Sequence, residues 1–126
     1  MTWDEMAIDL LKASKAMLKT HPRSSASRAY YAAHIALAKI LQERGFVPGR
    51  PYSTQPHLRQ ARLIGEFLNH LGVLGVRNLR QLFNRLYSRR IDADYVRTVT
   101  INEQIALDSV RDASSVFVVL GIQELV

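Results

Sequence analysis

The sequence predicts an all-α fold, an antiparallel up-and-down bundle of four to five helices. Two observations indicate this class. Apolar residues recur every three or four positions in five separate segments, which is the period of an amphipathic helix. No segment alternates with period two for long enough to form a sheet. Since most of the connections between the five segments are short, neighbouring helices are expected to run antiparallel.

The first helix is expected to begin at a capping box and to end at a proline. Thr2 and Glu5 have the spacing at which the threonine caps the helix and the glutamate bonds back to it. His21-Pro22 stands where the apolar period stops. The stripe between them consists of Trp3, Met6, Leu10, Ala13 and Met17.

The second helix spans about twenty residues, or about 30 Å. Ser24 and Ser25 are candidate N-caps, and Gly45 stands where a helix ends. Its apolar stripe consists of Ala26, Tyr30, Ala33, Leu37, Ile40 and Leu41. Residues 45–56, which follow it, carry three of the four prolines and form the one clear loop.

Three helical segments follow the loop. Their stripes consist of Leu58, Ala61, Ile64, Phe67, Leu68 and Leu71, then Val76, Leu79, Phe83, Leu86 and Arg90, then Ala106, Val110, Ala113, Phe117 and Leu120. Gly72 and Gly75 bracket a short turn, and residues 91–99, which lack a period, are expected to form a connector. Thr100 has the spacing of a second capping box, and Gly121 marks the end of the last helix.

The composition is that of one globular domain, residues 1–126. The chain has a mass of 14.3 kDa and is 48% hydrophobic. It has no cysteine, which excludes a disulfide scaffold, a cysteine nucleophile and a cysteine-type zinc site. The acidic amino terminus differs from a signal peptide, and the longest apolar stretch, 116–122, is far shorter than the roughly 20 residues that span a bilayer. We therefore expect a cytoplasmic protein without membrane contact.

The chain is basic, and most of its cations are arginines. Seventeen Lys and Arg against 11 Asp and Glu give a net charge of +6. Arginine suits the bidentate recognition of phosphate, so nucleic acid is the first partner to consider. The candidate RNA-binding residues lie on the polar arc of the fourth helix and are Arg77, Arg80, Arg85 and Arg89. A merely solvated face is the alternative interpretation.

Arg90 differs from these arginines because it continues the apolar stripe four residues after Leu86. A guanidinium that points inward must be paired, since an unpaired buried charge is very costly. Asp92 and Asp94 are the nearest acids. Two interpretations stay open. In the first, Arg90 has a structural role only: it forms an ion pair that pins the connector to the helix end, or it extends into solvent at a frayed helix end. In the second, Arg90 is a functional residue in a cleft or at a subunit interface.

The histidines do not have the spacing of metal ligands. His21, His34, His57 and His70 are scattered, and the sequence has neither a His-x-x-x-His pair nor a phosphate-binding glycine loop. We expect no metal and no other cofactor. His34 lies at the edge of an apolar stripe, which is typical of a hydrogen-bonded packing residue.

Two segments resemble the HEPN family. Ser27-Arg-Ala-Tyr-Tyr-Ala-Ala33 is similar to the Ser-Arg-x-Tyr-Tyr-Ala pattern of the second HEPN helix. Arg90-Ile-Asp-Ala-Asp-Tyr95 looks like the Arg-x-x-Ala-Asp-Tyr segment of one prokaryotic branch. The resemblance implies a small helical bundle that forms a homodimer. It also implies a toxin–antitoxin pair, in which the HEPN protein is encoded beside a minimal nucleotidyltransferase.

Active HEPN members are metal-independent ribonucleases with an Arg-x(4–6)-His motif, and this chain departs from that motif. No histidine follows Arg85, Arg89 or Arg90 within reach. The spacing occurs elsewhere, as Arg28–His34 and Arg50–His57, but about 1.2 such matches are expected by chance.

Three interpretations of function remain. In the leading one, the chain is the toxin-like or binding half of a two-component system with a nucleotidyltransferase, and RNA is a candidate ligand of this half. The second is an endoribonuclease with a divergent catalytic centre at Arg90, Asp94 and Tyr95. The third is a non-catalytic dimeric interaction module.

Overall fold

The computed structural model describes residues 2–48 and 57–123. It contains five α-helices and two 3₁₀ helices, and no strand occurs among those residues. The elements are α1 (Trp3–Ala16), α2 (Pro22–Glu43), η1 (His57–Arg59), α3 (Gln60–Phe67), η2 (Asn69–Leu71), α4 (Gly72–Tyr95) and α5 (Glu103–Leu120). Most of the predicted loop 45–56 lies outside the described residues.

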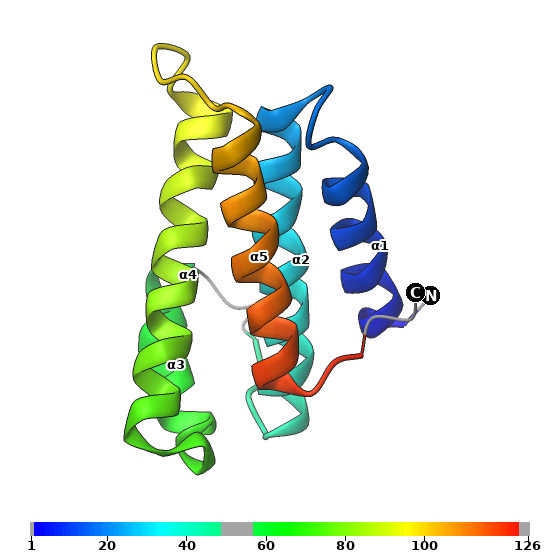
Figure 1. The fold of residues 1–126 in the computed structure, drawn as a ribbon. Helices are drawn as coiled ribbons and strands as arrows, with labels where there is room; N and C mark the ends of the chain where they lie inside the picture. The colour runs from blue at the N-terminus through cyan, green and yellow to red at the C-terminus, as the bar shows by residue number, and fades with distance from the viewer. Residues whose placement is uncertain (1, 49–56, 124–126) are drawn as a thin grey trace.

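The four long helices stand side by side and alternate in direction (Figure 1). In that view α1 runs upward, α2 downward, α4 upward and α5 downward, while the shorter α3 lies beside the first half of α4. Helix α2 is central because it packs against α1, α4 and α5. The predicted all-α antiparallel bundle is confirmed.

The core is built on a row of small residues in α2. Alanine side chains let neighbouring helices approach α2 closely. The fully buried ones are Ala26, Ala29, Ala32, Ala33 and Ala36. Large apolar side chains from the other helices fill the space around them, and these include Leu11, Leu79, Phe83, Leu86 and Phe117.

The predicted stripe of the first helix is wrong by one position. Ala7, Leu11 and Ser14 are buried, whereas Met6 is 39% exposed. The reason is a buried polar contact in which the Ser14 hydroxyl donates to the Ser25 carbonyl at 2.6 Å and the Ser25 hydroxyl donates to the Ser14 carbonyl at 2.7 Å. Ser25 therefore joins α1 to α2 instead of capping a helix.

Three predicted boundaries also differ from the structure. The predicted turn at Gly72 and Gly75 falls inside α4, where Gly72 opens the helix with a positive φ of 79°. Helix α4 continues to Tyr95 instead of ending before a connector, because Ala93 is buried against α2 and the segment before α5. Asn102, not Thr100, caps α5. The capping box of Thr2 in α1 is present as predicted.

Arg23 of α2 ties down the end of α4. Its guanidinium donates hydrogen bonds to the carbonyl oxygens of Asp92 at 3.0 Å and Ala93 at 3.1 Å, and also to that of Val99. Asp92 and Ala93 lie in the last turn of α4, where a helix leaves carbonyl groups short of amide partners, although the Asp92 carbonyl also accepts from the Val96 amide at 3.2 Å. Arg23 thus holds residues 92–99 against α2.

Replacing Arg23 with alanine should lower the free energy of unfolding by about 2 kcal/mol, since charge-assisted hydrogen bonds to several carbonyls are lost together. Urea denaturation followed by circular dichroism measures this loss. Arg111→Ala, which removes an exposed arginine of α5, serves as the control and should change stability by less than about 0.5 kcal/mol. Equal losses in the two variants would contradict the role given to Arg23.

Candidate functional site

Arg90 lies on the face of α4 that packs into the bundle. Its side chain is 16% exposed, and its Nε lies 3.0 Å from the Oδ2 of Asp94, four residues further along the helix. The contact is an ion pair whose geometry is too bent for a hydrogen bond. Arg90 is therefore paired, as a charge in this position must be, and the pairing occurs within a helix instead of across a connector.

Three tyrosine rings surround the Arg90 guanidinium, and we call them the tyrosine cage. The ring centroids of Tyr31 and Tyr95 each lie 5.2 Å from the guanidinium carbon, and that of Tyr30 lies 5.9 Å away. The Arg90 Nη2 also donates to the hydroxyl groups of Tyr31 and Tyr95. Distances of this size give favourable cation–π contacts.

The tyrosine cage opens to solvent on one side. Tyr30 is 3% exposed, but Tyr31 is 36% exposed and Tyr95 is 69% exposed. The structure thus places Tyr30 in the core, as its position in the apolar stripe predicts, and Tyr31 at the surface. A ligand at the surface can reach the outer rings and the edge of the guanidinium they hold.

The two segments that carry the family resemblance meet at this point. Ser27 of α2 donates a hydrogen bond of 3.1 Å to the Oδ2 of Asp94 in α4, the same oxygen that pairs with Arg90. Since α2 and α4 run antiparallel, the beginning of α2 lies beside the end of α4 (Figure 1). Residues separated by about sixty positions in the sequence therefore form one cluster.

A buried polar network lies behind the tyrosine cage. The Tyr30 hydroxyl is 3.0 Å from the Nδ1 of His57 and 3.4 Å from the Nδ1 of His34. Gln60 of α3 donates from its amide nitrogen to the Nδ1 of His34 at 2.6 Å. His34 is a hydrogen-bonded packing residue, as the sequence indicates.

Burial keeps this network uncharged at neutral pH. The pKa of His34 is lowered to about 4, mainly by burial and to a smaller extent by the charges of His57 and Arg90. Burial also lowers the pKa of His57, again with a contribution from Arg90. The pKa of the Tyr30 hydroxyl is raised by burial above its ordinary value. Both imidazoles are therefore neutral at pH 7, and Tyr30 keeps its proton.

His57, like Gln60, is a residue of this site that the sequence did not predict. Its ring stacks on that of Tyr87 in α4, with 3.3 Å between ring centroids and an interplanar angle of 6°. It reaches the site from η1, which is remote in sequence from α2 and α4. The spacing Arg50–His57 is the only sequence signal, and Arg50 lies outside the described residues.

The four candidate RNA-binding arginines do not gather at the tyrosine cage. Arg85 and Arg89 both pair with Asp112 of α5, at 3.1 and 2.7 Å. Burial alone raises the pKa of Asp112, but hydrogen bonds from these two arginines hold it below its ordinary value.

The other two of these arginines lie further toward the start of α4. Arg80 donates from Nε to the carbonyl of Ala61 at 2.8 Å. A side chain at Gly65 would collide with the Arg80 guanidinium, so that glycine makes room for it. Arg77 is exposed and lies thirteen residues before Arg90, or about 20 Å along the helix axis.

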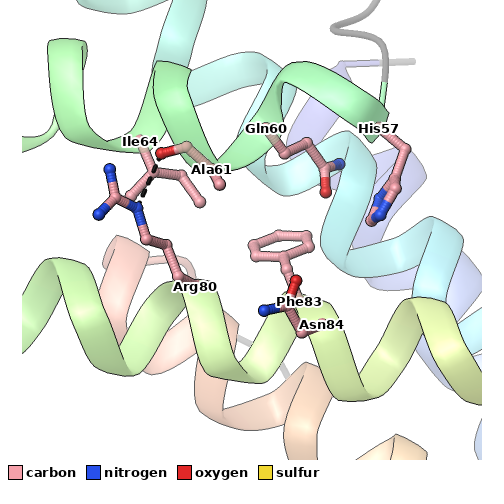
Figure 2. A pocket seen from close by; sticks show the side chains of 7 residues that line it. All are labelled: His57, Gln60, Ala61, Ile64, Arg80, Phe83 and Asn84. Atoms are coloured by element: carbon pink, nitrogen blue, oxygen red, sulfur yellow. Dashed lines mark hydrogen bonds between the residues drawn. The ribbon is translucent and has the colours of Figure 1, made fainter.

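A cavity of about 170 Å³ lies between α3 and α4, beside His57 (Figure 2). It is lined by His57, Gln60, Ala61, Ile64, Arg80, Phe83 and Asn84.

Across the described ranges no three histidine, aspartate or glutamate side chains are grouped so that they could hold a metal ion. None of the helices described is both long enough and apolar enough to cross a membrane.

The comparison with protein families identifies the family of this chain. The sequence model of the HEPN domain matches residues 1–123, which is nearly the whole chain of 126 residues. Searches of curated proteins and of solved structures gave no match. The family match agrees with the helical bundle and with the meeting of the two motif segments around Arg90. The chain belongs to the HEPN domain family.

Proposed function

We propose that this HEPN protein binds single-stranded RNA at the tyrosine cage, with a phosphate at Arg90. The observation that carries the proposal is the arginine held between two solvent-exposed tyrosine rings and paired with Asp94. Guanidinium groups bind phosphate, and exposed aromatic rings stack on bases without regard to sequence. Asp94 and Tyr95 orient Arg90 for this contact.

The fixed position of its guanidinium favours Arg90 over the other arginines of α4 as the residue that binds the phosphate. Its guanidinium is held on several sides, so little side-chain entropy remains to be lost when it binds a ligand. Arg85 and Arg89 share one carboxylate, which neutralises part of their charge. These two arginines and the exposed Arg77 add only a diffuse positive field that attracts an anionic strand.

Replacing Arg90 with glutamine should weaken the binding of short single-stranded RNA at least about tenfold, because a charge-assisted phosphate contact is lost. Fluorescence anisotropy with labelled RNA measures the dissociation constant. Affinity of the unmodified protein should also fall steeply as salt is raised.

Two further variants sharpen this test. Arg90→Lys keeps the charge but loses the planar fork, so its affinity should lie between that of the unmodified protein and that of Arg90→Gln. Arg111→Gln removes the same charge from an exposed position of α5 and should have little effect. Unchanged affinity in Arg90→Gln, or binding that salt does not weaken, would refute the RNA site.

We further propose that the protein works as a homodimer and as the toxin-like or binding component of a pair with a nucleotidyltransferase. Family membership supports this proposal, because HEPN domains commonly form dimers. Light scattering after size-exclusion chromatography measures the mass. Co-purification with a nucleotidyltransferase encoded in the neighbouring reading frame tests the pairing. A monomer that copurifies with no such protein would contradict both.

A second candidate function, metal-independent RNA cleavage, is favoured by one observation. His57 is neutral at pH 7 and is joined to the tyrosine cage through the hydroxyl of Tyr30. A neutral imidazole near a phosphate-binding arginine has the chemistry needed to activate the 2′-hydroxyl of RNA. In this reaction Arg90 holds the phosphate, and Asp94 and Tyr95 position Arg90. A cage that binds RNA without cleaving it would instead support the non-catalytic module.

A further inference from the structure

The cavity beside His57 lies close to the tyrosine cage. Asn84, on its α4 side, precedes Arg90 by six residues, which corresponds to about 9 Å along the helix. His57 belongs to both places, since it lines the cavity and contacts the ring of Tyr30, with 5.8 Å between ring centroids. A base next to a phosphate held at Arg90 is therefore within reach of this cavity, which lies about 9 Å along α4 and about 120° around the helix from Arg90.

The size of the cavity fits a single six-membered ring. A cavity of about 150 Å³ in another protein holds one benzene molecule, and this one measures about 170 Å³. Its walls include the ring of Phe83, the ring of His57 and the side chain of Ile64. These surfaces suit the flat faces of an aromatic heterocycle, whereas the two fused rings of a purine need more room.

One polar atom of the cavity, the Oε1 of Gln60, needs a ligand that carries a hydrogen-bond donor. The Oε1 of Gln60 is buried and has no hydrogen-bond partner among the described residues, whereas the amide nitrogen of Gln60 donates to His34. An unsatisfied buried acceptor costs stability and is an exception that needs an explanation. In Figure 2 the Gln60 amide points across the cavity toward Phe83 and Asn84.

We propose that this cavity is a base subsite for a pyrimidine of the RNA strand. An N–H group of the base, N3–H of uracil or the 4-amino group of cytosine, donates to the Oε1 of Gln60. The side-chain amide of Asn84, which is exposed at the cavity, bonds to another polar atom on the base edge. The inference rests on the proposed RNA binding at Arg90 and adds a preference for single-ring bases.

The subsite gives a sequence preference that the tyrosine cage does not. Stacking on Tyr31 and Tyr95 accepts any base. The Oε1 of Gln60 is already buried and unpaired in the free protein, so a base that donates to it gains a hydrogen bond that a base unable to reach it does not gain. RNA binding as such thus depends on Arg90, and the choice of base depends on Gln60 and Asn84.

The test compares short oligo(U), oligo(C) and oligo(A) in the same anisotropy assay. The unmodified protein should bind the pyrimidine strands at least about tenfold more tightly than oligo(A). Asn84→Leu should reduce this preference to less than about threefold, whereas Arg90→Gln should weaken binding to all three strands by a similar factor. Asn78→Leu changes the same residue type at an exposed position of α4 that does not line the cavity, and it should keep the preference.

A second measurement separates a base of the strand from a free nucleotide. Nitrogen-15 NMR spectra should show that oligo(U) shifts the side-chain amide signals of Gln60 and Asn84 at lower concentration than uridine monophosphate does. Tighter binding of the mononucleotide than of the strand would overturn the proposal in favour of a free-nucleotide site. RNA binding without base preference would overturn the subsite and leave the proposed function intact. The absence of any RNA binding would refute both.

Discussion

Replacing His57 with asparagine should lower RNA cleavage at least about 100-fold and leave the affinity for oligo(A), which does not use the His57 wall of the base subsite, within about threefold of that of the unmodified protein. The amide group of asparagine occupies nearly the position of the histidine Nδ1, so the contact with the Tyr30 hydroxyl is kept. What is lost is the ring nitrogen that can take up a proton. Cleavage rates are measured with excess protein and in the presence of EDTA, because the reaction is proposed to need no metal.

The chemistry behind this expectation can be written atom by atom. His57 in the tautomer that donates Nδ1–H to the Tyr30 oxygen has a free lone pair on Nε2. Nε2 removes the proton of the ribose 2′-hydroxyl, the 2′-oxygen forms a bond to phosphorus, and the bond from phosphorus to the 5′-oxygen breaks. The leaving 5′-oxygen takes a proton from the imidazolium, which gives a 2′,3′-cyclic phosphate and a 5′-hydroxyl. Arg90 stabilises the negative charge on the phosphate oxygens throughout.

The pH dependence follows from the pKa of His57, which burial and the charge of Arg90 lower. The base must be neutral to act, so the rate should rise with pH and level off below the ordinary histidine range of about 6.5. His70→Asn, at an exposed histidine of η2, is the matched control and should keep full activity. If the unmodified protein does not cleave RNA, or if His57→Asn cleaves as fast, cleavage at this centre is excluded.

The fold was predictable wherever apolar side chains alone make the packing face. The stripes of α2 and α4 point into the core as expected, and Phe83 and Leu86 are almost fully buried. The stripe of α1 was misplaced because Ser14, a polar residue, is buried through its hydrogen bonds with Ser25. A pattern that counts only apolar residues cannot show a polar pair that is satisfied across two helices.

The site was predictable in its helical part only. Arg90 and Asp94 are four residues apart, so a helix through both places them in contact, and the resemblance to the family connected Ser27 with the same segment. His57 and Gln60 could not be assigned, since they reach Tyr30 through the packing of η1 and α3 against the long helices. Contacts between residues so far apart in the chain depend on tertiary structure, and they produce no characteristic residue spacing in the sequence.

Lowering the pH from about 6.5 to about 4 should reduce the free energy of unfolding by about 3 kcal/mol through His34. In the folded protein its pKa is lowered to about 4, mainly by burial, whereas in the unfolded chain it lies near 6.5. The unfolded state therefore binds the proton more readily across this interval. The stabilising contribution is complete above pH 6.5, declines by up to about 1.4 kcal/mol per pH unit, and is lost once the pH falls through the folded pKa.

Two neighbouring groups affect the same curve and can be separated from His34. The lowered pKa of His57 acts in the same direction, so His57→Asn should remove a further, smaller part of the slope. The lowered pKa of Asp112 acts at more acidic pH, because that carboxylate loses its contribution only as it becomes protonated below about 4.

Urea denaturation at a series of pH values measures the free energy of unfolding, and the informative quantity is the slope between pH 6.5 and 4. His34→Gln keeps a polar side chain next to Gln60 but cannot be protonated, so its curve should be flatter than that of the unmodified protein, whatever its stability at pH 7. His70→Asn, which removes an exposed histidine, should keep the full slope. Parallel curves for the unmodified protein and His34→Gln would show that the buried imidazole does not carry the pH dependence.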